Sequence, residues 1–450
     1  MAPKNSAPTS CCIYHDRAIL RMRIMAQLGF SVEDDTGEFR LADYVAAAEE
    51  REKPTWPMLT VLDEACNACV RTRYLVTNAC QGCLAQPCIV NCGKKAIEIK
   101  NGRSCIDESK CVNCGLCMQN CPYHAIIKIP VPCEEACPVG AISKNEKGKE
   151  TINYDKCIFC GNCMRECPFG AMMDKSQLFD VIKHIMNGKN VVAMYAPAIA
   201  AQFKSKPGQL EGALKKAGFN KVYEVAKGAD ICAEKEAKEF EKRMQDGEKL
   251  MTTSCCSAYV RAVKVHVPDL LPCVSDTKSP MHYTAELAKS ENADCVTVFV
   301  GPCLAKRREG IDDDFVDYVI SVEELSALFS AKDIDVMNEE CAELASPPSA
   351  SGRSFAASGG VANAVKLRLQ NPDILRVGII DGLNKDGMKK LAYYGKIQAG
   401  VLKPTDETPN LVEVMSCQGG CIAGPCVVTN PKVAAVQLKK YVEAGEQPKE

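Results

Sequence analysis

The spacing of the cysteines constrains this chain more than any other feature of its sequence. Three cysteines at three-residue intervals, then a fourth before a proline, occur twice: at Cys111, Cys114, Cys117, Cys121 and Pro122, and at Cys157, Cys160, Cys163, Cys167 and Pro168. Three thiolates at these intervals surround one cuboidal 4Fe–4S cluster, while the cysteine before proline ligates the other cluster of a pair. The pattern therefore predicts a ferredoxin-like region that carries electrons.

Sixteen cysteines between Cys66 and Cys167 follow short intervals of this kind. The crossed ligation rule divides them into four sets, and we expect one 4Fe–4S cluster in each. The sets are Cys80, Cys83, Cys88 and Cys121; Cys92, Cys111, Cys114 and Cys117; Cys137, Cys157, Cys160 and Cys163; and Cys66, Cys69, Cys133 and Cys167. The last set forms only if the loop that carries Cys66 and Cys69 folds back, and a zinc site there is the alternative.

The composition indicates the setting in which these thiols work. Cysteine-rich disulfide scaffolds are short secreted chains, whereas this chain has 450 residues and no apolar signal segment after Met1, so we expect a cytoplasmic protein. No apolar run approaches the roughly 18 residues of a membrane span. With a net charge of −2, nothing favours nucleic acid or anionic lipid as a partner.

The sequence divides into three parts. Residues 1–60 form an N-terminal helical segment, 61–175 a ferredoxin-like iron–sulfur region with two two-cluster units, and 176–450 an alternation of strands and helices. In the third part we expect strands at 191–195, 296–300, 377–380 and 411–415, and helices at 208–217, 322–329 and 432–444. The predicted fold class is α+β multidomain, with ferredoxin-like domains followed by an α/β domain whose ligand site lies at strand ends.

Three cysteine motifs in the third part indicate the chemistry. They are Thr253-Ser254-Cys255-Cys256-Ser257-Ala258-Tyr259, then Gly301-Pro302-Cys303-Leu304-Ala305-Lys306-Arg307-Arg308-Glu309, and Glu413-Val414-Met415-Ser416-Cys417-Gln418-Gly419-Gly420-Cys421. Each alone is weak, because a buried cysteine is commonly just a small apolar side chain. Together and in this order they resemble the signature segments of iron-only (FeFe) hydrogenases. Ala196-Pro197-Ala198 and Gly228-Ala229-Asp230, which we expect to precede a Glu-rich helix, extend the resemblance.

The resemblance implies a cofactor and the residues that hold it. The family's H-cluster is a 4Fe–4S cube linked through a cysteine sulfur to a two-iron centre with CO, cyanide and azadithiolate ligands. By motif, the cube ligands are Cys256, Cys303, Cys417 and Cys421, the last as the bridge. Cys255 would be the proton-delivering thiol and Lys306 would bind a cyanide, a surface position for this lysine being the alternative. Pro197, Ala198 and Met415 would line the pocket.

The resemblance also implies a proton relay. It passes from Cys255 to Glu239, then to Ser275, and reaches the surface at Glu236. The two glutamates are three residues apart and so share one face of a helix. We expect their burial to raise the pKa of both carboxyl groups. A merely solvated helix face is the alternative for this stretch.

The function implied by these motifs is reversible interconversion of H2 with protons and electrons. The expected partners are H2 and protons, a ferredoxin or similar electron carrier, and the maturation proteins that insert the two-iron centre. Ser257 stands where proline is usual in the family and Gly301 where methionine is usual, which indicates a divergent branch. An H2 sensor, for which an appended signalling domain would be expected, and an iron–sulfur assembly factor without turnover are the alternatives.

Overall fold

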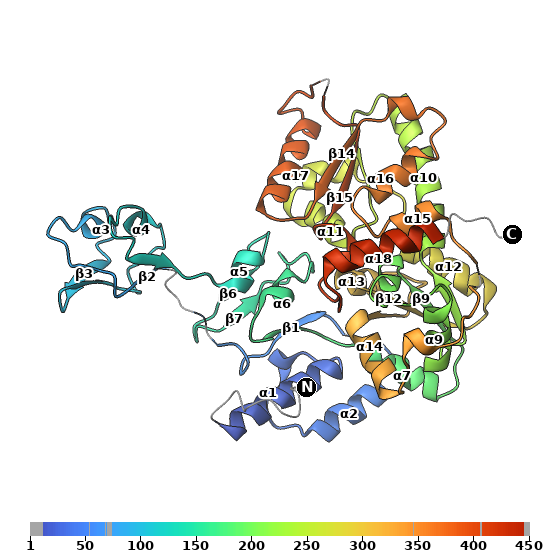
Figure 1. The fold of residues 1–450 in the computed structure, drawn as a ribbon, viewed down its shortest axis with the longest axis horizontal. Helices are drawn as coiled ribbons and strands as arrows, with labels where there is room; N and C mark the ends of the chain where they lie inside the picture. Colours follow the sequence, from blue (N-terminus) through green and yellow to red (C-terminus); the bar gives the residue numbers. More distant parts are fainter. Residues whose placement is uncertain are drawn as a thin grey trace.

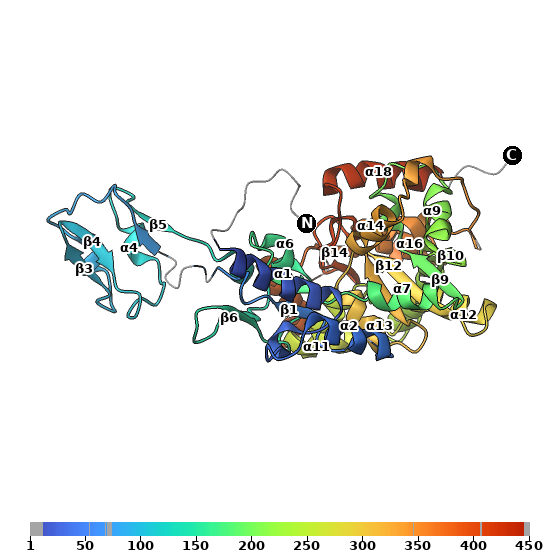
Figure 2. The same ribbon diagram turned by 90° about the horizontal axis from the view of Figure 1, so that it is seen from below.

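The computed structural model describes residues 12–444, apart from 54, 68, 70–73, 345 and 406. A large α/β body lies at one end of the molecule, the N-terminal helices lie beside it, and iron–sulfur modules extend away from it (Figures 1 and 2). Within the described residues, no helix combines the length and apolar character needed to cross a membrane.

The described part of the N-terminal segment contains two helices, and it contacts the α/β body. It consists of α1 (Ile13–Gln27), the 3-10 turn η1 (Val32–Asp34) and α2 (Leu41–Glu50). Arg51, directly after α2, forms an ion pair of 2.6 Å with the fully buried Asp180 on α7 (Leu178–Met186). This bidentate contact joins two segments far apart in the sequence.

The iron–sulfur unit next to the body is built from two separate stretches of chain, residues 58–69 and 131–174, and we call it the proximal unit. Strand β1 (Leu59–Val61) pairs antiparallel with β8 (Met172–Asp174), which closes the unit. Its other elements are α5 (Pro132–Ala136), β6 (Ile142–Lys144), β7 (Glu150–Ile152) and α6 (Asn162–Glu166).

Residues 74–128 form a second module, the distal module, which contains two of the expected cysteine sets and is inserted between Cys69 and Cys133 of the proximal unit. It contains β2 (Tyr74–Val76), α3 (Pro87–Val90), β3 (Ile97–Lys100), β4 (Arg103–Ile106), α4 (Leu116–Gln119) and β5 (Ile126–Lys128). Strands β2 and β5 pair antiparallel with Tyr74 opposite Lys128, so the module begins and ends at the same place. It stands apart from the body in both views (Figures 1 and 2).

The first sheet of the body is parallel, with strand order β10-β9-β12-β13. Its strands are β9 (Val191–Tyr195), β10 (Lys221–Glu224), β12 (Val296–Gly301) and β13 (Tyr318–Ser321). All five residues of β9 are buried, as an apolar strand covered on both faces should be. Around it lie α7, α8 (Pro197–Ala200), α9 (Gln209–Ala217), α12 (Pro280–Glu291), α14 (Val322–Ala331) and η3 (Val336–Asn338). The expected strands at 191–195 and 296–300 are confirmed.

The second sheet has the order β11-β15-β14 and is also parallel. Its strands are β11 (Met251–Thr252), β14 (Val377–Asp381) and β15 (Leu411–Met415). The helices of this half are α10 (Ala226–Gln245), α11 (Ser257–His266), η2 (Pro268–Cys273), α13 (Ala305–Ile311), α15 (Ala350–Ser354), α16 (Gly360–Lys366), η4 (Pro372–Ile374), α17 (Lys385–Gln398), η5 (Cys421–Ala423) and α18 (Pro431–Ala444). The mixed α+β multidomain fold is therefore as expected.

One expectation about α10 is wrong. Gly228-Ala229-Asp230 does not precede the helix, because α10 begins at Ala226 and includes these residues. The glycine has a packing reason instead: a Cβ at Gly228 would lie 2.2 Å from the carbonyl oxygen of Pro280, at the start of α12. The small residue lets α10 and α12 approach closely.

Candidate active site and iron–sulfur relay

The three cysteine motifs and the Ala196-Pro197-Ala198 segment all follow the C-terminal ends of parallel strands. Pro197 follows β9, Cys303 follows β12, Cys417 follows β15, and Cys255 and Cys256 follow β11. Parallel strands open their carboxyl ends on the same edge of a sheet, where ligands bind. Two adjacent parallel sheets thus bring segments more than 200 residues apart to one place.

Four thiols gather at this place. Burial raises the pKa of Cys256, Cys303, Cys417 and Cys421, to about 11 for Cys303 and about 12 for Cys421. In the last three, neighbouring thiols of the same set add to the rise, which shows that the sulfurs are close to one another. Thiols that resist ionisation in the protein alone become thiolates when metal binds. The donor set therefore fits a 4Fe–4S cube.

Apolar side chains enclose the four thiols. Ala198 is fully buried and packs in one apolar cluster against Cys421, while Met415, 2% exposed, packs in another against Cys255. Pro197 is also buried and starts the short helix α8. These are the three residues expected to line the pocket, and the structure brings all of them to the thiols. Such walls exclude water from a metal centre.

Lys306 lies inside the site and not on the surface. Its Nζ forms an ion pair of 2.6 Å with Glu309 Oε2, on the next turn of α13. Burial acts to lower the pKa of Lys306, but the Glu309 carboxylate and the thiols of Cys303 and Cys255 raise it overall. The lysine is therefore a fixed cation beside the thiols. Glu309 is itself fixed, because the hydroxyls of Ser257 and Ser279 donate to its two oxygens.

Glu236 is the carboxylic acid next to Cys255. Its exposed fraction is 0%, and its Oε1 accepts hydrogen bonds from Ser254 N (3.1 Å) and Ser254 Oγ (3.3 Å). Burial raises the pKa of Glu236 to about 7, with Glu239 adding to the rise. After burial, Glu236 is the largest influence raising the pKa of the Cys255 thiol. The two groups are thus close neighbours.

Glu239 lies further out, so the expected order of the relay is wrong. Ser275 Oγ donates to Glu239 Oε2 at 2.6 Å, and Arg243 forms an ion pair of 2.7 Å with Glu239 Oε1. Burial acts to raise the pKa of Glu239, but hydrogen bonds from Ser275, Asp276 and Thr277 and the Arg243 charge lower it overall. The order is therefore Cys255, Glu236, Ser275, Glu239. The expected rise in pKa holds for Glu236 and fails for Glu239.

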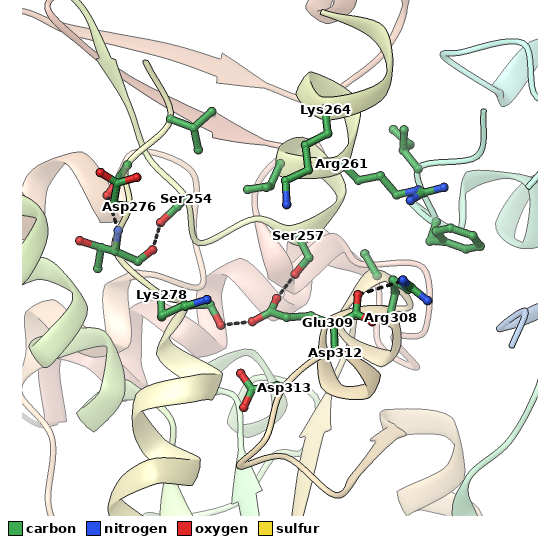
Figure 3. A pocket seen from close by; sticks show the side chains of 18 residues that line it. Ser254, Ser257, Arg261, Lys264, Asp276, Lys278, Arg308, Glu309, Asp312 and Asp313 are labelled. Carbon is green, nitrogen blue, oxygen red and sulfur yellow. Dashed lines mark hydrogen bonds and ion pairs between the residues drawn. The ribbon is translucent and has the colours of Figure 1, made fainter. Parts of the chain in front are cut away.

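A cavity of about 490 Å³ opens beside this network (Figure 3). Ser254, Ser257, Ser275 and Glu309 are among the residues that line it. Figure 3 shows Ser257 pointing toward Glu309, while Ser254 turns to the opposite side, where its hydroxyl donates to the carbonyl oxygen of Thr277 at 2.5 Å. Ser275, which carries the hydroxyl group of the relay, is thus part of the cavity wall.

The structure gathers the cysteines of the iron–sulfur region into the four expected sets. Three of the sets each line one pocket, two in the distal module and one in the proximal unit. In the fourth set, the thiols of Cys137, Cys157 and Cys160 raise the pKa of Cys163, after burial. Cys66 and Cys69 lie beside Cys133 and Cys167, as expected if their loop folds back, because the residues between Cys69 and Cys133 form the separate distal module. Cluster ligation by these sets stays a prediction.

The fourth set contacts the active site directly. The Cys160 thiol is among the groups that raise the pKa of Cys417. Between Cys160 and Cys163, Gly161 has φ +76°, and a Cβ there would lie 2.5 Å from the side chain of Pro425, so the loop touches the segment that follows the third motif. Cys256 and Cys303 also pack against the apolar cluster of the proximal unit. The thiols of this set thus lie beside the four cysteines of the candidate active site.

Comparison with protein families agrees with this geometry. The family described as "Iron only hydrogenase large subunit, C-terminal domain" matches residues 189–425, which is more than half of the chain. The chain belongs to the iron-only hydrogenase family. The family described as "4Fe-4S binding domain" matches residues 105–127 and 150–173, one stretch in each two-cluster unit.

Several hydrogenases are similar to this family member along much of its length. The NADP-reducing hydrogenase subunit HndD of Solidesulfovibrio fructosivorans is 30% identical over 313 residues, 57% of this chain and 53% of the relative. Iron hydrogenase 1 of Clostridium pasteurianum is 28% identical over 402 residues, 74% of this chain and 67% of the relative. The chain thus spans about half to two thirds of the length of these two relatives.

A probable cytosolic Fe-S cluster assembly factor of Nematostella vectensis is also similar, at 26% identity over 264 residues, 47% of this chain and 59% of the relative. Among solved structures, an FeFe hydrogenase variant of Chlamydomonas reinhardtii has a TM-score of 0.45 at 22% identity, covering 56% of this chain and 84% of that one.

Sequence reasoning missed three residues of this hydrogenase-family site: Ser254, Thr277 and Glu309. Ser254 and Thr277 bond the two relay glutamates, and Glu309 holds Lys306. Ser254 and Glu309 stand inside the quoted motifs, so their position gave a signal. Thr277 gave none, because its contact with Glu239 depends on how the 274–279 segment packs against α10.

Proposed function

We propose that the chain is an FeFe hydrogenase that interconverts H2 with protons and electrons. The observation that carries this proposal is the placement of Cys255 and Lys306 together beside four converging cysteines, with a buried acid behind Cys255. A protein that only stored or delivered a cube would need the four cysteines alone. A thiol and a fixed cation at the same place serve a reaction.

The site fits the H-cluster that the family implies. Cys256, Cys303, Cys417 and Cys421 would hold the cube, Cys421 as the bridge to the two-iron centre, and Pro197, Ala198 and Met415 would shield it. Lys306 would bind an anionic ligand of the centre through a charge-assisted hydrogen bond, which is strong in a dry pocket. When bound, the cofactor supplies the redox chemistry by which two protons and two electrons become H2.

The protein's own part is to move protons and to exclude bulk water. Cys255 delivers or receives the proton at the site, and Glu236 exchanges it with Cys255. A carboxyl group whose pKa lies near 7 exists in both protonation states at neutral pH, as proton transfer in both directions requires. Ser275 connects Glu236 to Glu239, which is ionised and paired with Arg243 at the outer end.

Electrons would travel through the four accessory clusters. The two sets of the distal module lie furthest from the body, the Cys66 set and the Cys137 set lie between, and Cys160 is next to Cys417 (Figure 1). We propose a ferredoxin-type carrier as the partner at the outer end. Maturation proteins would insert the two-iron centre after the cubes have formed.

An iron–sulfur assembly role without turnover is the second candidate, because one similar protein is described as such a factor. Infrared spectroscopy of anaerobic protein, co-produced with maturation proteins, separates the two functions. CO and cyanide bands together with H2 production from a reduced viologen dye are the expected result. Full occupancy of the cubes without these bands or H2 production would favour the assembly role and contradict our proposal.

A further inference from the structure

Glu150 is a buried acid in the wall of one cysteine set. It lies on β7, its exposed fraction is 2%, and it lines the same pocket as Cys66, Cys69, Cys133 and Cys167. One of its oxygens, Oε2, has no hydrogen-bond partner in the part of the chain that the structure describes. A carboxylate in such a place is costly, so what it does to the pocket needs an explanation.

The β6–β7 hairpin keeps this carboxylate in place. Lys144 is the cross-strand partner of Glu150, and its Nζ forms an ion pair with Glu150 Oε1. Burial raises the pKa of Glu150 overall, and the nearby Lys144 ammonium, which favours the ionised form of the acid, opposes this rise. After burial, Glu150 is the largest influence raising the pKa of Cys133, to about 12, so its negative charge acts inside the pocket.

Each of the other three sets has a basic neighbour, as Cys69 has in Lys144, which acts to lower its pKa. Lys94 lines the pocket of Cys92, Cys111, Cys114 and Cys117. Arg103 acts to lower the pKa of Cys80, and Arg261 acts to lower that of Cys157. Among the described residues that line the three cysteine pockets, Glu150 is the only acidic side chain.

A negative charge opposes the arrival of an electron, and it does so more strongly where water is excluded. Net charge around a cluster is one of the factors that set its reduction potential. We propose that the Glu150 carboxylate lowers the reduction potential of the cluster held by Cys66, Cys69, Cys133 and Cys167 and makes it the accessory cluster that is hardest to reduce. This cluster lies between the distal module and the set of Cys137, Cys157, Cys160 and Cys163. The carboxylate therefore gives the cluster in the middle of the relay a lower reduction potential than its neighbours.

The inference rests on cluster ligation within the proposed function, but it does not require H2 turnover. The test therefore uses the full chain produced without maturation proteins, with its cubes reconstituted, and reads potentials from a redox titration followed by electron paramagnetic resonance. The signal that disappears in Cys133→Ser identifies the cluster. Failure of H2 turnover in the matured protein would leave this measurement unaffected.

The two members of the ion pair should shift this potential in opposite directions. Glu150→Gln removes the negative charge and leaves Lys144, so the potential should rise. Lys144→Gln removes the positive charge and leaves Glu150, so the potential should fall. Glu146→Gln, at an exposed position in the same hairpin, is the matched control and should leave all signals in place.

A structural role for the pair would move both variants alike, and shifts in the same direction, or no shift in either variant, would overturn the proposal. If Glu150→Gln loses the cluster, Lys144→Gln decides: a lower potential supports the proposal, and an unchanged or higher one overturns it. Zinc in place of iron at this set would overturn it as well, because zinc has no redox signal.

Discussion

The iron–sulfur half and the catalytic half of the molecule enclose their cysteines in opposite ways. In the distal module, strands are three or four residues long, and the core contains the cysteines themselves, with Cys88 and Cys117 packed against Ile97 and Ile126. In the catalytic half, a large apolar core is built on the first parallel sheet, and the active-site cysteines follow strand ends at its margin. We therefore expect the first half to need its clusters in order to fold, and the second half to fold before it receives one.

The largest effect expected from this difference follows removal of iron. Anaerobic chelation should unfold residues 74–128 and much of the proximal unit, because metal-binding energy is folding energy in small cluster domains. The sheets of residues 176–444 should persist. Hydrogen exchange of the full chain measures both halves at once. Equal protection of both halves after chelation would contradict the expectation that only the iron–sulfur half needs metal in order to fold.

Loss of one active-site ligand should be severe but local. Cys303→Ala should prevent stable assembly of the H-cluster and abolish H2 turnover, while the accessory clusters remain. Matured protein should contain about 22 iron atoms, from five cubes of four and a two-iron centre. The variant should keep about 16, and an iron count near that of the matured protein would show that Cys303 is not a ligand.

Cys255→Ala should leave the catalytic half assembled and remove its proton donor. We expect the infrared bands to persist and turnover to fall by orders of magnitude, because proton transfer needs a group within hydrogen-bond reach. Cys295→Ala is the matched control, since this thiol is buried in the core of the first sheet and has no role in our proposal. Turnover of Cys255→Ala at the wild-type rate would refute the assigned role.

The corrected relay order predicts a dependence on pH. Glu236 has a raised pKa of about 7, so its acid form, which delivers protons, is lost as pH rises through 7, and H2 production should decline there. Glu236→Gln should lower the rate by about 10²-fold or more and flatten this decline. Glu239→Gln should also lower the rate, without removing the titration near 7. Glu234→Gln, at an exposed position on the same helix, should change neither quantity.

The smallest effect on catalysis is expected from excision of the distal module. Because Tyr74 and Lys128 are paired neighbours, a short loop can replace residues 74–128. The shortened protein should lose about eight iron atoms and its exchange with a ferredoxin-type carrier, yet keep its infrared bands and its activity with a small dye. Loss of the dye-linked activity would show that the two units are one folding unit.

Local patterns explain how much of this could be predicted from the sequence. Cysteine intervals and apolar runs are local, so the four cysteine sets and strands such as 191–195 could be recognised from residues alone. The order of Glu236 and Glu239 in the relay could not be predicted, because both lie on one face of α10. Which of them is nearer Cys255 depends on the direction in which α10 runs past β11. The position of Glu150 beside a cysteine set could not be predicted either, since its pocket is lined by residues from 66 to 172.

The contact between Gly161 and Pro425 has a consequence for the order in which the protein is made. The loop that carries the innermost set lies against a segment synthesised 264 residues later, with no room even for a methyl group between them. The segment that contains Pro425 leaves the ribosome after this loop, so it can pack only against a loop that has already been made. We therefore expect the Cys137 set to bind its cluster before the segment around Pro425 packs against it and encloses the active site.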